Sequence, residues 1–108
     1  MGEVHDRLVS TYRQKLIRNK YKICRSRLVD YKPDIYATKN SEGLLIEAEI
    51  PVTLWNDHTL HQLELMYKHI QGNRKIKGIL LVPKKIIKDA RHLIEMTFGD
   101  DSIRVEGI

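Results

Sequence analysis

Apolar side chains near the start of the chain recur every four residues, at Val4, Leu8, Tyr12 and Leu16. Residues four apart lie on one face of a helix, so this spacing predicts an amphipathic helix over residues 3–19. After this helix the apolar positions alternate with polar ones, which is the period of a strand. The alternation predicts three strands, at residues 21–28, 34–38 and 43–50. Their short polar connections favour an antiparallel meander.

The second half of the chain switches between the two periods. Helical spacing predicts helices over residues 57–71 and after Pro83, the second one closed by Gly99. The apolar run IKGILLV, at 76–82, is typical of a central strand buried on both faces, and a last strand is expected at 102–108. The predicted order is αβββαβαβ, an α/β fold with a mixed sheet flanked by helices. A length of 108 residues suits one domain, 1–108.

Composition narrows the class of protein. The chain is 42% hydrophobic and has no apolar run near the roughly 20 residues of a membrane span, so no membrane partner is expected. Its first residues, MGEVHDRL, are charged and do not resemble a secretory signal. Cys24 is the only cysteine, which excludes an intramolecular disulfide and a cysteine-based zinc site. We therefore expect an intracellular, cytoplasmic protein.

The net charge of +5 is unevenly distributed along the chain. Residues 33–66 carry six acidic and one basic side chain, and they lie between two strongly basic segments, 1–32 and 67–91. One interpretation is an ordinary solvated surface. The other is that an acidic pocket binds a cation and that the basic surface around this pocket binds a polyanion. Under the second interpretation the candidate phosphate-binding residues are Arg25, Arg27, Lys84, Lys85 and Lys88.

Two acids interrupt the most apolar of the predicted strands, LLIEAEI. Glu47 and Glu49 are two residues apart and therefore share a face, and Asp34 begins the preceding strand. Hairpin pairing would bring these carboxylates together, where they repel unless a cation lies among them. Oxygen ligands suit Mg²⁺ or Mn²⁺. Two alternatives are open: the glutamates face solvent, or they pair with Lys or Arg of a neighbouring strand.

The pattern Pro33-Asp34, a spacer, and then Glu47-Ala48-Glu49 at the end of an apolar strand resembles the PD-(D/E)XK nuclease superfamily. It is similar to the compact archaeal-type Holliday junction resolvases and to RecB-like or restriction-type nucleases, and the resemblance covers most of the chain. It implies a restriction endonuclease-like core and a metal-dependent DNA endonuclease, with structure-specific cleavage as one option. Asp34 and Glu47 would hold Mg²⁺ or Mn²⁺, and the protein would act on DNA as a homodimer.

The sequence departs from the family pattern at one important position. The family's usual lysine, which orients or activates the attacking water, falls where this chain has Glu49. Glu49 would then be a further catalytic acid, as in a minority of restriction enzymes. One alternative is a migrated lysine, with Lys39, Lys84 and Lys85 as candidates. The other is a catalytically inactive nuclease-fold module that binds nucleic acid or a protein partner, so both an enzyme and a binding module are open.

Two further residues are possible members of the site. The family often has an acid near the start of the first helix, which here is Glu3, although a first-turn acid is also favoured by the helix dipole. Some RecB-like members carry a glutamine on the helix after the motif, which here is Gln62. The same glutamine completes a T-x-x-Q capping box with Thr59, which explains it without any chemistry.

Overall fold

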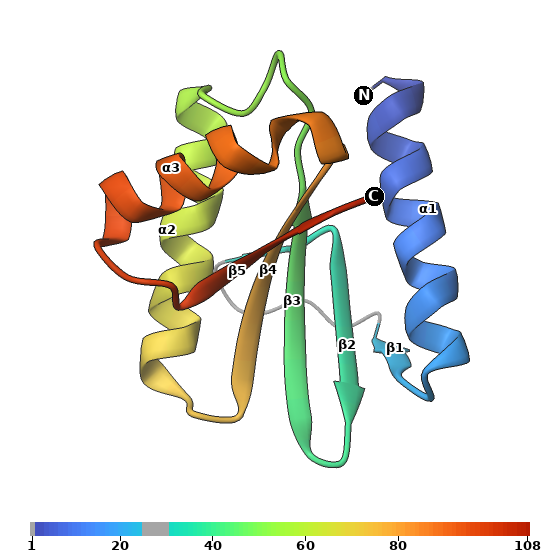
Figure 1. The fold of residues 1–108 in the computed structure, drawn as a ribbon. Coiled ribbons are helices and arrows are strands. Elements are labelled where there is room, and N and C mark those ends of the chain that lie inside the picture. Colours follow the sequence, from blue (N-terminus) through green and yellow to red (C-terminus); the bar gives the residue numbers. More distant parts are fainter. Residues whose placement is uncertain (1, 25–30) are drawn as a thin grey trace.

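The computed structural model describes residues 2–24 and 31–108, and it consists of one five-stranded sheet with helices on both faces (Figure 1). The elements, in chain order, are α1 (Glu3–Arg18), β1 (Lys22–Cys24), β2 (Ile35–Lys39), β3 (Glu42–Ala48), α2 (Asp57–Gly72), β4 (Ile76–Val82), the 3₁₀ turn η1 (Lys84–Ile86), α3 (Ile87–Phe98) and β5 (Ile103–Gly107). The predicted α/β fold with a mixed sheet is confirmed. None of the helices in the described part of the chain is long and apolar enough to cross a membrane.

The first three strands form the predicted antiparallel meander, with β2 between β1 and β3. The β2–β3 hairpin closes through two residues, because Lys39 pairs directly with Glu42. Both loop residues, Asn40 and Ser41, have positive φ angles, 52° and 71°. Two positive angles make the turn that matches the twist of the flanking strands, and asparagine tolerates them well. The predicted strand at 21–28 is seen as β1; its remainder, with Arg25 and Arg27, lies outside the described residues.

The last strands pair in parallel, in the order β3-β4-β5, so that β4 is internal in the sheet. Leu80 and Leu81 point to opposite faces of β4, and neither side chain is exposed. This confirms the prediction of a central strand buried on both sides. The helices α2 and α3 make the two crossovers between the parallel strands (Figure 1). The α3 helix ends at Gly99, whose φ of 72° is the left-handed conformation of a C-terminal cap.

Each face of the sheet has its own core. On one face, Leu44, Ile46 and Ala48 of β3 pack with the apolar side of α1. On the other face, Leu45 packs with side chains of α2 and α3. Strand side chains alternate between the two faces of a sheet. Glu47 and Glu49, two and four residues after Leu45, therefore point to the same face as Leu45, which α2 covers. The fold thereby fixes the side of the sheet on which the acids lie.

The helix α2 begins at Asp57 as predicted, but its N-terminal cap differs from the prediction. The N-cap is Asn56, whose side-chain oxygen accepts a hydrogen bond of 2.8 Å from the His58 N–H. Thr59 lies inside the first turn and is buried. The predicted capping box of Thr59 with Gln62 is therefore wrong, because the cap has already been supplied three residues earlier. The Thr59 hydroxyl does not cap the helix and can form other hydrogen bonds.

Replacing Leu80 by alanine tests the burial of β4 on the face that α2 and α3 cover. The side chain is fully buried, so its loss leaves a cavity, and the free energy of unfolding should fall by about 2–5 kcal/mol. Val52→Ala is the control: Val52 is 83% exposed, so its truncation should change the value by less than about 0.5 kcal/mol. Urea denaturation of both variants measures the difference, and equal effects would contradict this description of the core.

Candidate functional site

The acids singled out in the sequence meet at one end of the β2–β3 pair. Ile35 pairs with Ile46, and continuing this register places Asp34 opposite Glu47. Glu49 follows the last residue of β3, and its N–H still donates to the Leu81 carbonyl of β4 at 2.9 Å. Only 5% of Glu47 and 8% of Glu49 are exposed. The alternative in which the glutamates face solvent is therefore wrong.

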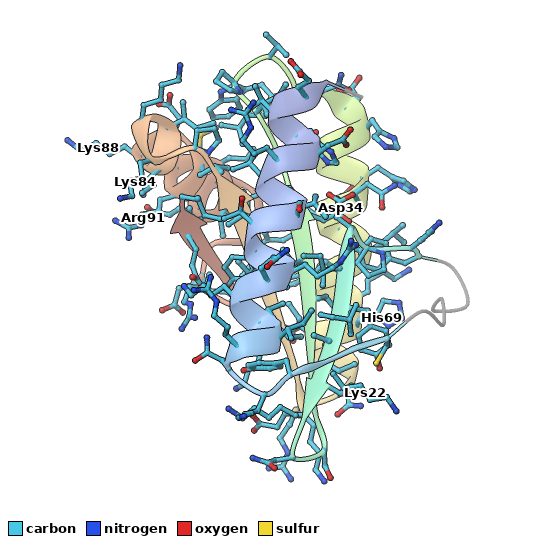
Figure 2. The ribbon with its side chains drawn as sticks, turned by 90° about the vertical axis from the view of Figure 1, so that its right-hand side faces the viewer. Lys22, Asp34, His69, Lys84, Lys88 and Arg91 are labelled. Atoms are coloured by element: carbon cyan, nitrogen blue, oxygen red, sulfur yellow. The ribbon has the colours of Figure 1, made fainter. Side chains whose placement is uncertain are left out.

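Asp34 ties the end of the hairpin to the first helix. Its Oδ2 accepts a hydrogen bond of 2.9 Å from the Ala48 N–H and lies 3.2 Å from His5 Nε2. Figure 2 shows Asp34 beside α1, the helix that carries His5. Burial lowers the pKa of His5, but the charge of Asp34 and hydrogen bonds to Asp6 and Asp34 outweigh it, and the net shift is upward. The negative charge of Asp34 thus favours the protonated form of His5.

Glu47 is held by a buried tyrosine. The Tyr31 hydroxyl donates to Glu47 Oε1 at 2.8 Å, and the Tyr31 ring stacks on His69 with centroids 5.9 Å apart. Burial is the main cause that raises the pKa of Glu47 to about 8, and the negative charges of Asp34 and Glu49 add to it. The Tyr31 hydrogen bond acts in the opposite direction but does not compensate. Glu47 therefore keeps its proton at neutral pH unless a cation arrives.

Glu49 is bonded to two threonine hydroxyls. Its Oε1 lies 2.7 Å from Thr53 Oγ1 and 3.0 Å from Thr59 Oγ1. Thr59 also lies 2.7 Å from the Thr53 carbonyl, and because a hydroxyl has one proton, it donates to only one of these acceptors at a time. Burial raises the pKa of Glu49, although the two hydroxyl bonds lower it. Glu49 thus fastens the 50–56 turn and the start of α2 to the end of β3.

The second alternative, pairing with Lys or Arg, is also wrong for the part of the chain that the structure describes. Within residues 2–24 and 31–108, neither Glu47 nor Glu49 forms an ion pair with a lysine or arginine. The groups that meet the three acids are a histidine, a tyrosine and two threonines. Hydroxyls stabilise a carboxylate without neutralising it, so His5, beside Asp34, is the one basic side chain among these groups.

The chemistry of the donors fits a hard divalent cation held by few protein ligands. Among the described residues, no three His, Cys, Asp or Glu side chains are grouped closely enough to hold a metal ion. Mg²⁺ usually takes one or two carboxylates and keeps several waters, so a pair suffices. Asp34 and Glu47 are the pair that lie opposite each other, and a cation between them would lower the pKa of Glu47 to the ionised range.

The remaining candidates are spread over the molecule. Glu3 is exposed in the first turn of α1. Gln62 lies one turn after Thr59 on α2, and its Oε1 is the only buried side-chain oxygen or nitrogen in the described residues without a hydrogen-bond partner. Lys84, Lys85 and Lys88 are exposed at η1 and the start of α3. Figure 2 shows Lys84 and Lys88 pointing outward, on the opposite side of α1 from Asp34.

Two members of the site could not be found from the sequence. Tyr31 falls in the connection between two predicted strands, and His5 in the first turns of a predicted helix, so neither has a pattern of its own. Their roles depend on contacts across 16 and 29 residues of chain. Comparison with known protein families, curated proteins and solved structures finds no match for this chain.

The pKa of Glu47 predicts an unusual dependence of stability on pH. The folded value of about 8 is above the ordinary 4.5, so the stabilising contribution is present below about pH 4.5 and is lost as pH rises through about 8. In EDTA, Glu47→Gln should remove most of this loss of stability. At about pH 9 its free energy of unfolding should exceed that of wild type by roughly 2–4 kcal/mol. The variant keeps an acceptor for Tyr31.

The measurement is urea denaturation at a series of pH values. Glu64→Gln, which changes an exposed glutamate of α2, is the matched control and should follow wild type. A Glu47→Gln protein that parallels wild type at every pH would show that Glu47 is ionised in the metal-free fold.

Proposed function

We propose that this protein is a metal-dependent DNA endonuclease that hydrolyses phosphodiester bonds. The observation that carries the proposal is Asp34 opposite Glu47 at the end of the β2–β3 pair, with Glu49 next to them and no lysine or arginine among the described residues paired with the glutamates. The order αβββαβαβ, with the acids at the ends of the second and third strands, agrees with the restriction endonuclease-like core that the sequence resembles.

Each residue of the site has a distinct task under this proposal. Asp34 and Glu47 bind the cation, and a bound Mg²⁺ or Mn²⁺ stabilises the charge on the scissile phosphate and makes its water more acidic. Tyr31 orients Glu47 through the 2.8 Å hydrogen bond, and His5 orients Asp34. The unpartnered oxygen of Gln62 is an acceptor for water or for the substrate, since a buried acceptor without a partner costs about 1–3 kcal/mol.

The protein would act as a homodimer, because symmetric cleavage of two DNA strands needs two sites. Lys84, Lys85 and Lys88 would contact phosphates, together with Arg25 and Arg27 from the segment outside the described residues. Contacts of this kind position the protein on DNA without reading its sequence.

The second candidate function is an inactive module of the same fold that binds nucleic acid or a protein partner. The environment of Glu49 favours it, because both bonds to Oε1 come from threonines that anchor the next helix. A side chain with that structural role need not take part in hydrolysis.

Cleavage assays on branched, duplex and single-stranded DNA test the proposal. We expect cutting in Mg²⁺ or Mn²⁺ and none in EDTA. Asp34→Asn and Glu47→Gln should each reduce it by more than about a hundredfold, since loss of even an outer-shell partner costs about 10–100-fold. Asp89→Asn, which changes an exposed acid of α3, is the control and should cut like wild type. If folded wild-type protein cuts none of these substrates with either metal, the proposed nuclease activity is refuted.

Glu49→Gln distinguishes a catalytic from a structural glutamate. The amide oxygen still accepts from Thr53 and Thr59, so the free energy of unfolding should stay within about 1 kcal/mol of wild type. If Glu49 assists hydrolysis, cleavage falls by at least about tenfold while stability and DNA binding are retained. Unchanged cleavage would assign Glu49 to the anchoring of α2 alone.

A further inference from the structure

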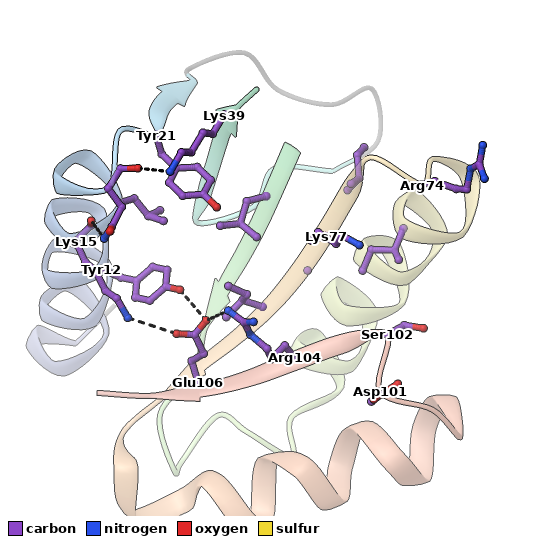
Figure 3. Close-up of a pocket in the computed structure, with 17 residues that line it drawn as sticks. Tyr12, Lys15, Tyr21, Lys39, Arg74, Lys77, Asp101, Ser102, Arg104 and Glu106 are labelled. Carbon is purple, nitrogen blue, oxygen red and sulfur yellow. Dashed lines mark hydrogen bonds and ion pairs between the residues drawn. The ribbon is translucent and has the colours of Figure 1, made fainter. Parts of the chain in front are cut away.

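A large groove lies on the face of the sheet opposite Glu47 and Glu49. It is bounded by the second half of α1, crosses β3, β4 and β5, and reaches the C-terminal end of α2 (Figure 3). Its volume is about 1040 Å³, at the upper end of the roughly 300–1,000 Å³ typical of ligand sites. Asp34, Glu47 and Glu49 are not among the described residues that line it. The groove is therefore separate from the acidic site.

The lining of the groove is basic at its rim and apolar at its floor. Five lysines and arginines line it against two acids; the basic residues are Lys15, Lys39, Arg74, Lys77 and Arg104. They come from α1, β2, the segment after α2, β4 and β5, so five separate parts of the fold bring positive charge to one recess. The half-buried side chains of Tyr21, Ile70 and Ile76 supply apolar surface between them.

The acid at the centre of the groove is already compensated. Glu106 Oε2 accepts hydrogen bonds from Tyr12 at 2.9 Å and from Arg104 at 2.7 Å, and its Oε1 lies 3.6 Å from Lys15 Nζ (Figure 3). Burial alone would raise the pKa of Glu106, but the bonds from Arg104 and Tyr12 lower it overall. Arg104 and Lys15 each keep further N–H donors, because a guanidinium has five and an ammonium three.

We propose that this groove binds a single strand of nucleic acid, with its phosphates on the basic rim and its bases on the apolar floor. Single-strand sites combine a positively charged groove with surfaces on which bases rest. The cations lie in a recess between a helix and a sheet, and only unpaired bases can turn toward its apolar floor while the phosphates contact the rim. The inference deepens the proposed function, because it supplies the nuclease with a path for one strand of its substrate.

Binding of a labelled oligothymidylate of about 12 nucleotides, measured by fluorescence anisotropy in EDTA, tests the groove. The double variant Lys77→Ala with Arg104→Ala removes two exposed cations of the lining. Each phosphate contact on a single strand contributes about 0.7 to the salt slope, so the slope should fall by about 1.4. That loss corresponds to about 25-fold weaker binding at 0.1 M salt.

The matched control is Lys68→Ala with Arg13→Ala, which removes the same charge from exposed positions outside the groove and should bind like wild type. The charge-retaining pair Lys77→Arg with Arg104→Lys should restore binding. Equal weakening of the groove and control variants would overturn the inference, because it would reflect net charge alone. If strand binding weakens only in the double variant Lys84→Ala with Lys88→Ala, the strand binds at η1 and α3 and the inference is overturned. If polyglutamate at equal charge displaces the strand, the groove is a site for an acidic peptide and the inference is also overturned.

The inference and the proposed function fail separately. Strand binding is measured without metal, so a protein that binds through the groove and cuts nothing supports the inference and refutes the nuclease. A protein that cuts DNA, and whose groove variants bind and cut like wild type, supports the nuclease and refutes the inference.

Discussion

The register of β3 is the constraint on which the rest of the molecule depends. This strand pairs antiparallel with β2 and parallel with β4, and it contributes side chains to both cores. A slip of one residue would move Glu47 and Glu49 into the apolar layer under α1 and would expel Ile46 from it. The two-residue loop at Asn40 and Ser41 fixes this register at one end, and the bond from the Ala48 N–H to Asp34 fixes it at the other.

The same register creates an electrostatic problem at the end of the sheet. It brings Asp34 opposite Glu47 and keeps both glutamates buried. Hydroxyl groups donate hydrogen bonds to the glutamates, and a histidine lies beside Asp34. Hydroxyls lower the energy of a carboxylate less than an ion pair does, and the pKa of Glu47 remains near 8. Groups perturbed in this way by burial and by one another are characteristic of functional sites, although structural networks also produce them.

The sheet separates the buried glutamates from the cations of the groove. Glu47 and Glu49 point to the face of α2 and Asp34 contacts His5 near the start of α1, whereas the groove is bounded by the second half of α1. This separation prevents a basic side chain of the groove from neutralising the acids. It also means that a polyanion in the groove does not meet the repulsion of the carboxylates directly. A nucleic-acid strand would have to pass around an edge or end of the sheet to reach both.

Local periodicity in the sequence was enough to determine the order of the elements, the meander, the internal position of β4 and the shared face of Glu47 and Glu49. These features repeat every two or four residues, so each is encoded within its own segment. The partners of the acids were decided only by tertiary structure: His5 reaches Asp34 because α1 docks across β2, and Tyr31 reaches Glu47 from a segment without periodicity. Thr59 could be misjudged as a cap for the same reason, because its role depends on Glu49, ten residues earlier. The groove likewise joins side chains from five parts of the chain, and only the packing of a helix beside an open stretch of sheet brings their charges together.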